Sequence, residues 1–462
     1  MRLGSASLAM AAVMGLTAPA SAQLFDDPAQ ARKPPARSAP AKKKPAADAN
    51  AAGDAHAATA AAATRPAGAP PVPFTPPPPK NGCHNTGSFD TWLAGFKKKA
   101  AAEGIKPGTI HSVLDGMTID QDIIGRDRKQ GFFQQTFVDF SGKLATPNRY
   151  QNGLAQMKKH AGLFARAEKE YGVPPAVIAA FWALESDFGS TPGIGKHNVL
   201  RALGTLAYDC RRSEMFTNEL MSALKIIDRG DLTAEQMTGS WAGELGQTQF
   251  LPSHYFNYAV DFDGDGRRDL YNSVPDVIGS SAYFVEQLGW KRGDPWLEEV
   301  RLPADMPWQE ADLAIRHPTL KWSSWGVTKA DGRPLDRGAP PASLMLLMGR
   351  HGPAFLAYPN FQVYIKWNQS LIYTTTAAYL ATRMAGAPPM SRGNGTVPPQ
   401  LPPEQMKELQ ILLQKRGFDI GNPDGKLGAG TRSAVRQMQA KLGQPADSWP
   451  TVELLDAMRR AK

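Results

Sequence analysis

One carboxylate in the sequence has the surroundings of a proton donor. Glu185 ends an apolar run, Val177 to Leu184, that follows the pair Pro174-Pro175. Proline suits the first turn of a helix, a helix apolar on every side belongs in a core, and Gly189 is expected to end it. Burial and the helix dipole both raise the pKa of a carboxyl group at that end. Glu185 is therefore predicted to be a general acid, although the polar end of a core helix would look the same.

A second set of carboxylates has the spacing of a metal site. In the segment DFDGDGRRD, residues 261–269, acids stand at positions one, three, five and nine, with glycine at six, as in an EF-hand calcium loop. Asn272 replaces the usual glutamate at position twelve, and Asp276 is the candidate replacement. A structural Ca²⁺ is predicted, with a tight Asp/Gly turn as the alternative. The predicted ligands are Asp261, Asp263, Asp265, Arg267, Asp269 and Asp276.

Amide and aromatic side chains gather in the stretch from Ser240 to Tyr258. Gln247 and Gln249 lie between Gly246 and Phe250. Amides can bond sugar hydroxyls, and aromatic rings can stack on pyranose faces. The stretch is therefore a candidate sugar-binding loop.

The elements that carry these residues are predicted to be mainly helical. Apolar residues recur at helical spacing near Phe89 and Trp92, and residues 276–290 are expected to form another helix. Short strands are expected among the later segments, including Phe361 to Asn368, which would deliver Asn368. The predicted fold class is mainly α, of the α+β kind.

Composition divides the chain into five parts. Residues 1–22 are a candidate signal peptide, and residues 23–81 are an Ala/Pro/Lys-rich stretch predicted to be a disordered tether. Residues 82–385 have the pattern of a globular catalytic domain. Residues 386–402, rich in Gly and Pro, are a linker, and residues 403–462 form a small helical unit. No acid pair or metal-ligand cluster stands out in the last part, so we expect a binding module there.

The N-terminus has the pattern of an export signal. A charged Arg2 precedes the apolar run Leu8 to Leu16 and the site Ala20-Ser21-Ala22, which predicts cleavage before Gln23. The run is too short to span a membrane stably, and no other stretch is long and apolar enough. No cysteine lies near the cleavage site, which argues against a lipid anchor. The mature protein is expected to be exported and soluble.

The charge balance favours a polyanionic partner. The formal net charge is +9, which suits nucleic acid, an acidic lipid surface or an acidic wall polymer. An exported protein rarely meets nucleic acid, so nucleic acid is not expected. Within the folded body, Arg211 and Arg212 belong to a polar cluster, and such a cluster is usually a solvated face.

Two cysteines, Cys83 and Cys210, are the only ones in the chain. In an exported protein they can form a single disulfide, and only one pairing exists. Such a bond would tie the start of the folded region to the segment after the Glu185 helix. Two free thiols are the alternative.

Several ordered motifs resemble the lytic murein transglycosylase B family. They are ALESDFG at 183–189, SWAGELGQTQFLPSHY at 240–255, AVDFDGDGRRDL at 259–270 and IGSSAYFVEQLGW at 278–290. The C-terminal GFDIGNPDGKLGAGTRSAVRQMQ resembles the three-helix peptidoglycan-binding module often fused to such enzymes. The resemblance implies a lysozyme-like catalytic domain in the periplasm. Its partners would be peptidoglycan glycan strands, with cell-wall synthases as further candidates.

The resemblance also implies a reaction and a set of site residues. The β-1,4 bond between N-acetylmuramic acid and N-acetylglucosamine would be cleaved without water, leaving a 1,6-anhydro end and needing no cofactor. Glu185 matches the family's single catalytic acid, which then acts as the base. The positions that match its saccharide-binding cleft are Arg211, Arg212, Ser240, Gln249, Asn368 and Tyr373.

The chain departs from the family pattern at three positions. Phe140 and Phe284 stand where some members have cleft tyrosines, and Glu244 stands where a small apolar residue is common. An extra acid could raise the pKa of Glu185 or serve as a base for water. A lysozyme-like hydrolase is therefore one alternative function, and an inactive wall-binding scaffold is another.

Overall fold

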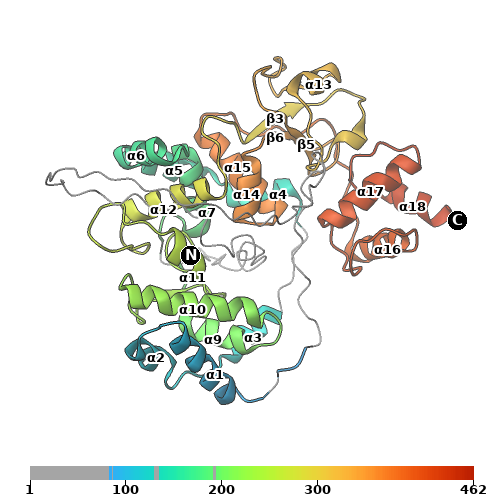
Figure 1. The fold of residues 1–462 in the computed structure, drawn as a ribbon. Helices are drawn as coiled ribbons and strands as arrows, with labels where there is room; N and C mark the ends of the chain where they lie inside the picture. The colour runs from blue at the N-terminus through green and yellow to red at the C-terminus, as the bar shows by residue number, and fades with distance from the viewer. Residues whose placement is uncertain (1–82, 86, 129–134, 191–193, 462) are drawn as a thin grey trace, which may run out of the picture.

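The chain folds mainly into helices arranged around one buried helix, α7 (Figure 1). The computed structural model describes residues 83–85, 87–128, 135–190 and 194–461, so the candidate signal peptide and the tether lie outside the described residues. Helix α7, Pro175–Ser186, begins after Pro174 as predicted, and all its residues after Pro175 are buried. It ends three residues before Gly189, because Asp187 already adopts a left-handed conformation with φ of 48°. The Asp187 carboxylate accepts a hydrogen bond from Arg149 Nη2 at 2.8 Å, which holds this turn in place.

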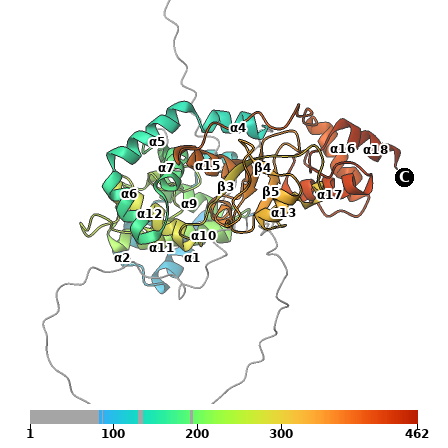
Figure 2. The same cartoon turned by 90° about the horizontal axis from the view of Figure 1, so that it is seen from above.

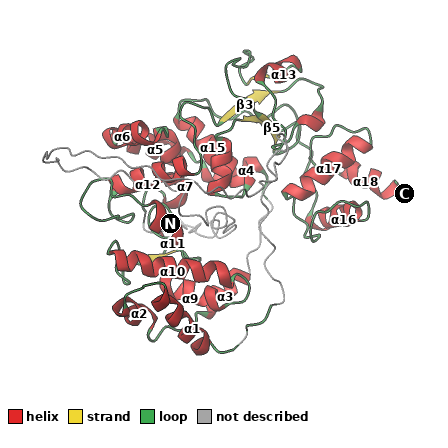
Figure 3. Ribbon diagram, in the orientation of Figure 1, coloured by secondary structure: helices red, strands yellow, loops and turns green. Residues whose placement is uncertain are grey.

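Helices α5, α6, α12 and α15 pack against α7, and a second group formed by α1, α2, α3, α9, α10 and α11 lies on its other side (Figures 1 and 3). Side-chain caps explain where several of them begin: Asn198, Ser273 and Ser370 each accept a hydrogen bond from a backbone N–H of the first turn. The remaining helices of this body are α1 (Phe89–Ala102), α2 (Pro107–Leu114), α3 (Gln121–Arg128), α4 (Phe137–Leu144), α5 (Pro147–Lys159), α6 (Ala161–Tyr171), α9 (Val199–Tyr208), α10 (Ser213–Arg229), α11 (Pro252–Tyr258), α12 (Val274–Gln287), α14 (Phe361–Trp367) and α15 (Leu371–Met384).

A four-stranded antiparallel sheet forms a smaller unit with its own core. Its strand order is β4-β3-β6-β5, with Leu297 opposite Ala357 between β3 and β6. The strands are β3 (Leu297–Arg301), β4 (Thr328–Lys329), β5 (Ser343–Leu346) and β6 (Ala354–Ala357), with the helices η4 (Trp308–Glu310) and α13 (Thr319–Ser324) beside them. A separate two-stranded pair joins β1 (His197–Asn198) to β2 (Thr238–Gly239), and β2 leads directly into the 240–258 stretch.

The strand predicted at Phe361 to Asn368 is wrong. The segment forms α14, Phe361–Trp367, and Asn368 is its C-cap. The apolar residues of this segment fit both the two-residue period of a strand and the 3.6-residue period of a helix, so packing decides between the two. In the helix, the Tyr364 ring stacks on Phe181 of α7 with 4.9 Å between centroids.

The C-terminal unit contains three helices, α16 (Pro403–Gln414), α17 (Ala429–Lys441) and α18 (Val452–Arg460), around a core of their own. It lies beside the sheet unit (Figure 2). Arg432 Nη2 donates a hydrogen bond to the Leu347 carbonyl at 2.8 Å, and Arg436 forms an ion pair with Asp312 at 2.7 Å. The predicted mainly helical fold class is confirmed. Among the described residues, no helix has the length and apolar character needed to cross a membrane.

A disulfide joins Cys83 to Cys210, with 5.8 Å between their Cα atoms. It fastens the segment before α1 to the loop between α9 and α10. The same junction is held by Cys210 N, which donates to Asn85 Oδ1 at 2.8 Å, and by the Tyr208 hydroxyl, which donates to the Gly87 carbonyl at 3.0 Å.

Candidate active site

Glu185 lies in the last turn of α7 with only 8% of its surface exposed. Two side chains from helices much later in the sequence hold its Oε1 atom. The Tyr373 hydroxyl of α15 donates a hydrogen bond at 2.6 Å, and Trp367 Nε1 of α14 donates a second at 2.8 Å. Burial raises the pKa of Glu185 to about 7, although both hydrogen bonds favour the carboxylate and lower it. Glu185 can therefore hold a proton at neutral pH and also exist as a stabilised carboxylate after giving it up.

The candidate sugar-binding loop is fastened to α7 by Gln247. Its Oε1 accepts a hydrogen bond from Trp182 Nε1 at 2.8 Å, and its Nε2 donates to the Tyr271 carbonyl at 2.7 Å. The Ser186 hydroxyl donates to the Gln247 carbonyl at 2.7 Å. A Cβ at Gly189 would lie 2.4 Å from the Gln247 amide oxygen, so this position requires glycine. Gln247, singled out as a sugar-binding amide, instead holds the loop beside the catalytic helix.

Three predicted cleft residues are held by local hydrogen bonds. Gln249 has a left-handed backbone with φ of 48°, and its Nε2 donates to the Gly246 carbonyl at 2.8 Å. Ser240 Oγ accepts hydrogen bonds from the backbone N–H groups of Ala242 and Glu244. Asn368 directly follows Trp367, and its Oδ1 accepts a hydrogen bond from Ser370 N at 2.9 Å.

The two arginines are not on a solvated face. Both bind Asp127, an acid only 2% exposed: Arg211 Nη1 donates to the Asp127 carbonyl at 2.7 Å, and Arg212 forms an ion pair with the carboxylate. The Arg212 guanidinium also lies over the Phe216 ring, 4.8 Å from its centroid. Its charge lowers the pKa of Glu244. The buried Asp127 thus positions both cations.

Glu244 is the second carboxyl of this site. Burial raises its pKa to about 7; the Ser240 hydroxyl and Arg212 lower it, and the charge of Glu185 raises it. Tyr373 is also within electrostatic reach of Glu244. The structure therefore brings Glu185, Tyr373, Ser240, Arg212 and Glu244 into one site.

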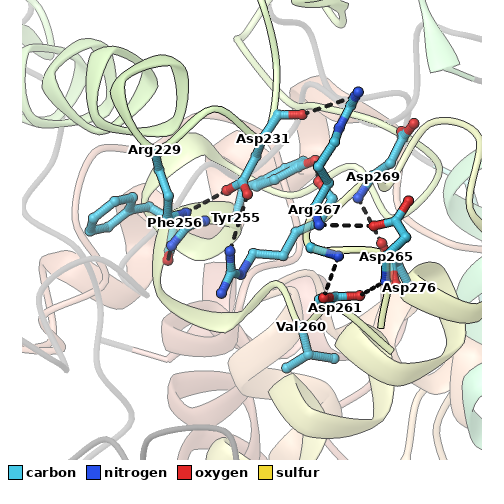
Figure 4. Close-up of polar contacts among 12 residues, drawn as sticks. Arg229, Asp231, Tyr255, Phe256, Val260, Asp261, Asp265, Arg267, Asp269 and Asp276 are labelled. Atoms are coloured by element: carbon cyan, nitrogen blue, oxygen red, sulfur yellow. Dashed lines mark hydrogen bonds and ion pairs between the residues drawn. The ribbon is translucent and has the colours of Figure 1, made fainter. Parts of the chain in front are cut away.

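The acidic loop brings three of its predicted metal ligands together. Ligand oxygens of Asp261, Asp263 and Asp276 lie within 4.8 Å of one another, and Figure 4 shows Asp261 beside Asp276. Asp276 is buried, and burial together with the neighbouring acids raises its pKa to about 6. Three carboxylates so close repel one another, and hard oxygen donors are what Ca²⁺ binds. The residues therefore fit the predicted cation.

The other predicted ligands bond elsewhere. Asp265 Oδ1 accepts a hydrogen bond from Arg267 N at 2.8 Å, and Asp269 Oδ1 accepts one from Tyr271 N at 2.9 Å. The Arg267 side chain donates to the Asp231 carbonyl at 3.5 Å, so only its backbone carbonyl could bind a cation (Figure 4). Among the described acids of this loop, the metal-site grouping includes Asp261, Asp263 and Asp276 and not Asp265 or Asp269.

Comparison with protein families identifies both folded parts. The transglycosylase SLT domain model matches residues 88–382, and a peptidoglycan binding domain model matches residues 402–458. The chain belongs to the transglycosylase SLT family. As the motifs indicated, its enzyme class is that of the peptidoglycan lytic transglycosylases.

Individual relatives agree with this assignment. Membrane-bound lytic murein transglycosylase B of Escherichia coli K12 is 31% identical over 250 residues, which are 54% of this chain and 67% of that protein. The crystal structure of Pseudomonas aeruginosa SltB3 with NAG-anhNAM-pentapeptide is 39% identical with a TM-score of 0.75, and covers 81% of this chain and all of that one. The Escherichia coli Slt35 structure in complex with calcium is 28% identical with a TM-score of 0.55, over 63% of this chain and 92% of that one.

Sequence reasoning missed two residues of the transglycosylase site, Trp367 and Asp127. Trp367 belongs to an aromatic cluster: its ring stacks on Phe181 with 4.0 Å between centroids and lies 5.3 Å from that of Phe284. Phe284 is buried and packs against Trp367, so at this position the chain has a core residue. Neither Trp367 nor Asp127 is distinguished by its neighbours in the sequence.

The transglycosylase is expected to lose activity above about pH 7, because the protonated fraction of Glu185 falls tenfold per pH unit above its pKa. Tyr373→Phe removes a donor that favours the carboxylate, so the pKa of Glu185 should rise. The alkaline limb of kcat/KM should then move to higher pH, even as the maximal rate drops. Initial rates from about pH 5 to about pH 9 measure this. A limb that stays in place or moves to lower pH would mean that another group controls it.

Proposed function

We propose that this chain cleaves the β-1,4 bond between N-acetylmuramic acid and N-acetylglucosamine in peptidoglycan and leaves a 1,6-anhydro end. The observation that carries the proposal is the buried Glu185, held at one oxygen by Tyr373 and Trp367. SltB3, whose structures contain NAG-anhNAM-pentapeptide and NAG-NAM-pentapeptide, supports the substrate class.

One carboxyl group is enough for this reaction. Oε1 of Glu185 accepts both hydrogen bonds, so the proton of the neutral acid belongs on Oε2. That proton passes to the glycosidic oxygen as the bond from C1 to this oxygen breaks. The Glu185 carboxylate then takes the proton of the C6 hydroxyl. The oxygen of that hydroxyl forms the new bond to C1. Ordinary glycosidases need two carboxyl groups, whereas an internal nucleophile held in place has a high effective molarity.

The mass of the products tests the proposal. Purified peptidoglycan is digested with the protein, and the released muropeptides are weighed by mass spectrometry. Anhydro products, lighter by one water than reducing-end products, are expected. Reducing-end products would make the chain a lysozyme-like hydrolase with Glu244 as the base for water. Retained binding to sacculi without products would make it a wall-binding scaffold.

The acidic loop is proposed to hold one structural Ca²⁺. Asp261, Asp263 and Asp276 would bind it, with Asp265, Asp269 and the Arg267 carbonyl as further candidate ligands. The ion would neutralise the gathered carboxylates and pin the loop between α11 and α12, and it takes no part in the chemistry. Slt35, solved in complex with calcium, supports the choice of metal.

Removing calcium is expected to lower the melting temperature of the protein by several degrees without changing the product. A ligand that binds only the folded state at about 100 times its Kd adds about 2.7 kcal/mol of stability. Thermal melts with EDTA and then with excess Ca²⁺ measure the shift. Asp276→Asn should abolish it, whereas Asp331→Asn, at an exposed acid in a distant turn, should leave it intact. A calcium shift that survives Asp276→Asn would contradict this site.

Export and wall binding complete the proposed function. The disulfide suits an oxidising compartment, and periplasmic export through residues 1–22 agrees with it. The C-terminal module, residues 402–458 by family comparison, is proposed to bind peptidoglycan and keep the catalytic domain on its substrate. Cell-wall synthases remain a proposed partner class that the tether, residues 23–81, could reach.

A further inference from the structure

Glu244 has a carboxylate oxygen that the protein leaves unsatisfied. The residue is half-buried, but its Oε2 atom is shielded from solvent and has no hydrogen-bond partner in the part of the chain that the structure describes. Leaving a buried acceptor without a partner lowers the stability of the folded state, and more so when the group is charged. Such a group in a folded protein calls for an explanation outside stability.

Hydrogen bonds hold the backbone around Glu244 in place. Ser240 N donates to the Glu244 carbonyl at 3.1 Å, and Glu244 N donates to Ser240 Oγ at 3.2 Å, which closes a tight turn. Gly239 completes the fit, since a Cβ there would lie 1.9 Å from the Glu244 carbonyl oxygen. The side chain therefore projects from a rigid loop.

The groups facing Glu244 are those of the active site. The charge of Glu185 on α7 raises the pKa of Glu244, whereas Arg212 before α10 and the Ser240 hydroxyl lower it. The charge of Glu244 in turn raises the pKa of Tyr373 on α15. Arg212 is already engaged by the buried Asp127. A second carboxylate beside Glu185 brings repulsion, so the fold gains nothing by placing it there.

Glu219 shows how the same molecule treats a buried glutamate with a structural role. It is only 1% exposed, and both of its oxygens are satisfied by Ser253. The Ser253 backbone N–H donates to Oε2 at 2.8 Å and its hydroxyl donates to Oε1 at 2.8 Å. The contrast with Glu244 Oε2 indicates that the missing partner of Glu244 comes from outside the chain.

We propose that Glu244 is a substrate-binding residue of the cleft, whose side chain rotates so that the unpaired Oε2 accepts a hydrogen bond from an O–H or amide N–H group of the bound glycan. This rests on the proposed function, since N-acetylated sugars present both kinds of donor. Binding would give Glu244 Oε2 the hydrogen-bond partner that it lacks among the described residues. Glu244 thereby adds affinity at the reacting site, while Glu185 remains the acid.

Binding in an inactive background tests this proposal. Soluble glycan strands of peptidoglycan are titrated, well below the melting temperature, into Glu185→Gln and into Glu185→Gln/Glu244→Ala. A hydrogen bond to a charged group is worth enough for the Kd to rise about tenfold or more in the double variant. Glu185→Gln/Glu244→Gln, which keeps an acceptor oxygen, should recover part of the affinity. Without glycan, the single variant Glu244→Ala should have a melting temperature no lower than that of the wild type, because the substitution removes an unsatisfied carboxyl group.

The matched control is the double variant Glu185→Gln/Glu219→Gln. It should melt lower than Glu185→Gln and bind the glycan with the same Kd. A Kd that changes less than twofold in Glu185→Gln/Glu244→Ala would overturn the proposal, whatever the melting temperature does. Failure of the proposed function is separate, because the wild type would then release no anhydro products. Normal anhydro products with an unchanged Kd would reject the role of Glu244 alone.

Discussion

Glu185→Gln is expected to abolish release of anhydro-muropeptides, with a loss of turnover on the order of 10³-fold or more. The amide cannot donate the proton that the glycosidic oxygen needs, and it cannot accept the proton of the C6 hydroxyl. Its oxygen can still accept hydrogen bonds from Tyr373 and Trp367, so the geometry around it is retained. Mass spectrometry of digests, with wild type run in parallel, measures the loss.

Thermal melts of the same variant test whether it is folded. The pKa of Glu185 rises from 4.5 to about 7 in the folded protein, so the folded state binds the proton more tightly than the unfolded chain. The stability that the protonated Glu185 gives the wild type is therefore lost as the pH rises from 4.5 to about 7. Glu185→Gln lacks this loss, so it should melt higher than wild type at about pH 8, with a smaller difference at about pH 4.5. Turnover retained in this more stable variant would assign the acid to another residue.

Loss of the disulfide is expected to have the largest effect on stability. The bond closes a sequence separation of 127 residues, and the chain-entropy account gives up to about 5 kcal/mol for a loop of that size. Cys83→Ser/Cys210→Ser should therefore melt roughly 5 to 10 °C lower than wild type. Differential scanning calorimetry measures the shift, and reducing agent should produce the same change in the wild type.

Catalysis should be affected much less than stability by this change. Arg211 and Arg212 follow Cys210 directly, but Asp127 holds both of them independently of the disulfide. Turnover per folded molecule, measured well below the melting temperature, should stay within a few-fold of wild type. If reducing agent leaves the wild-type melting temperature unchanged, the bond does not form in solution.

Local sequence was sufficient for the features that depend on neighbouring residues. The apolar run before Glu185, with its proline start, predicted a buried helix ending in an acid, and α7 has that form. The fold class and the family followed from ordered motifs, and the three-helix C-terminal unit followed from its apolar spacing. The spacing of the acidic loop predicted a cation site, although only Asp261, Asp263 and Asp276 are grouped in the structure.

Only the tertiary structure decided how the acid is held and what surrounds it. Trp367 and Tyr373 lie 182 and 188 positions from Glu185 in the chain, so no local pattern could pair them with it. The helix at Phe361–Trp367 was decided by packing on Phe181, because its apolar residues fit either period. The free oxygen of Glu244 also belongs to this class. Whether a buried polar atom has a partner depends on every segment folded around it, and the sequence by itself does not specify those distances.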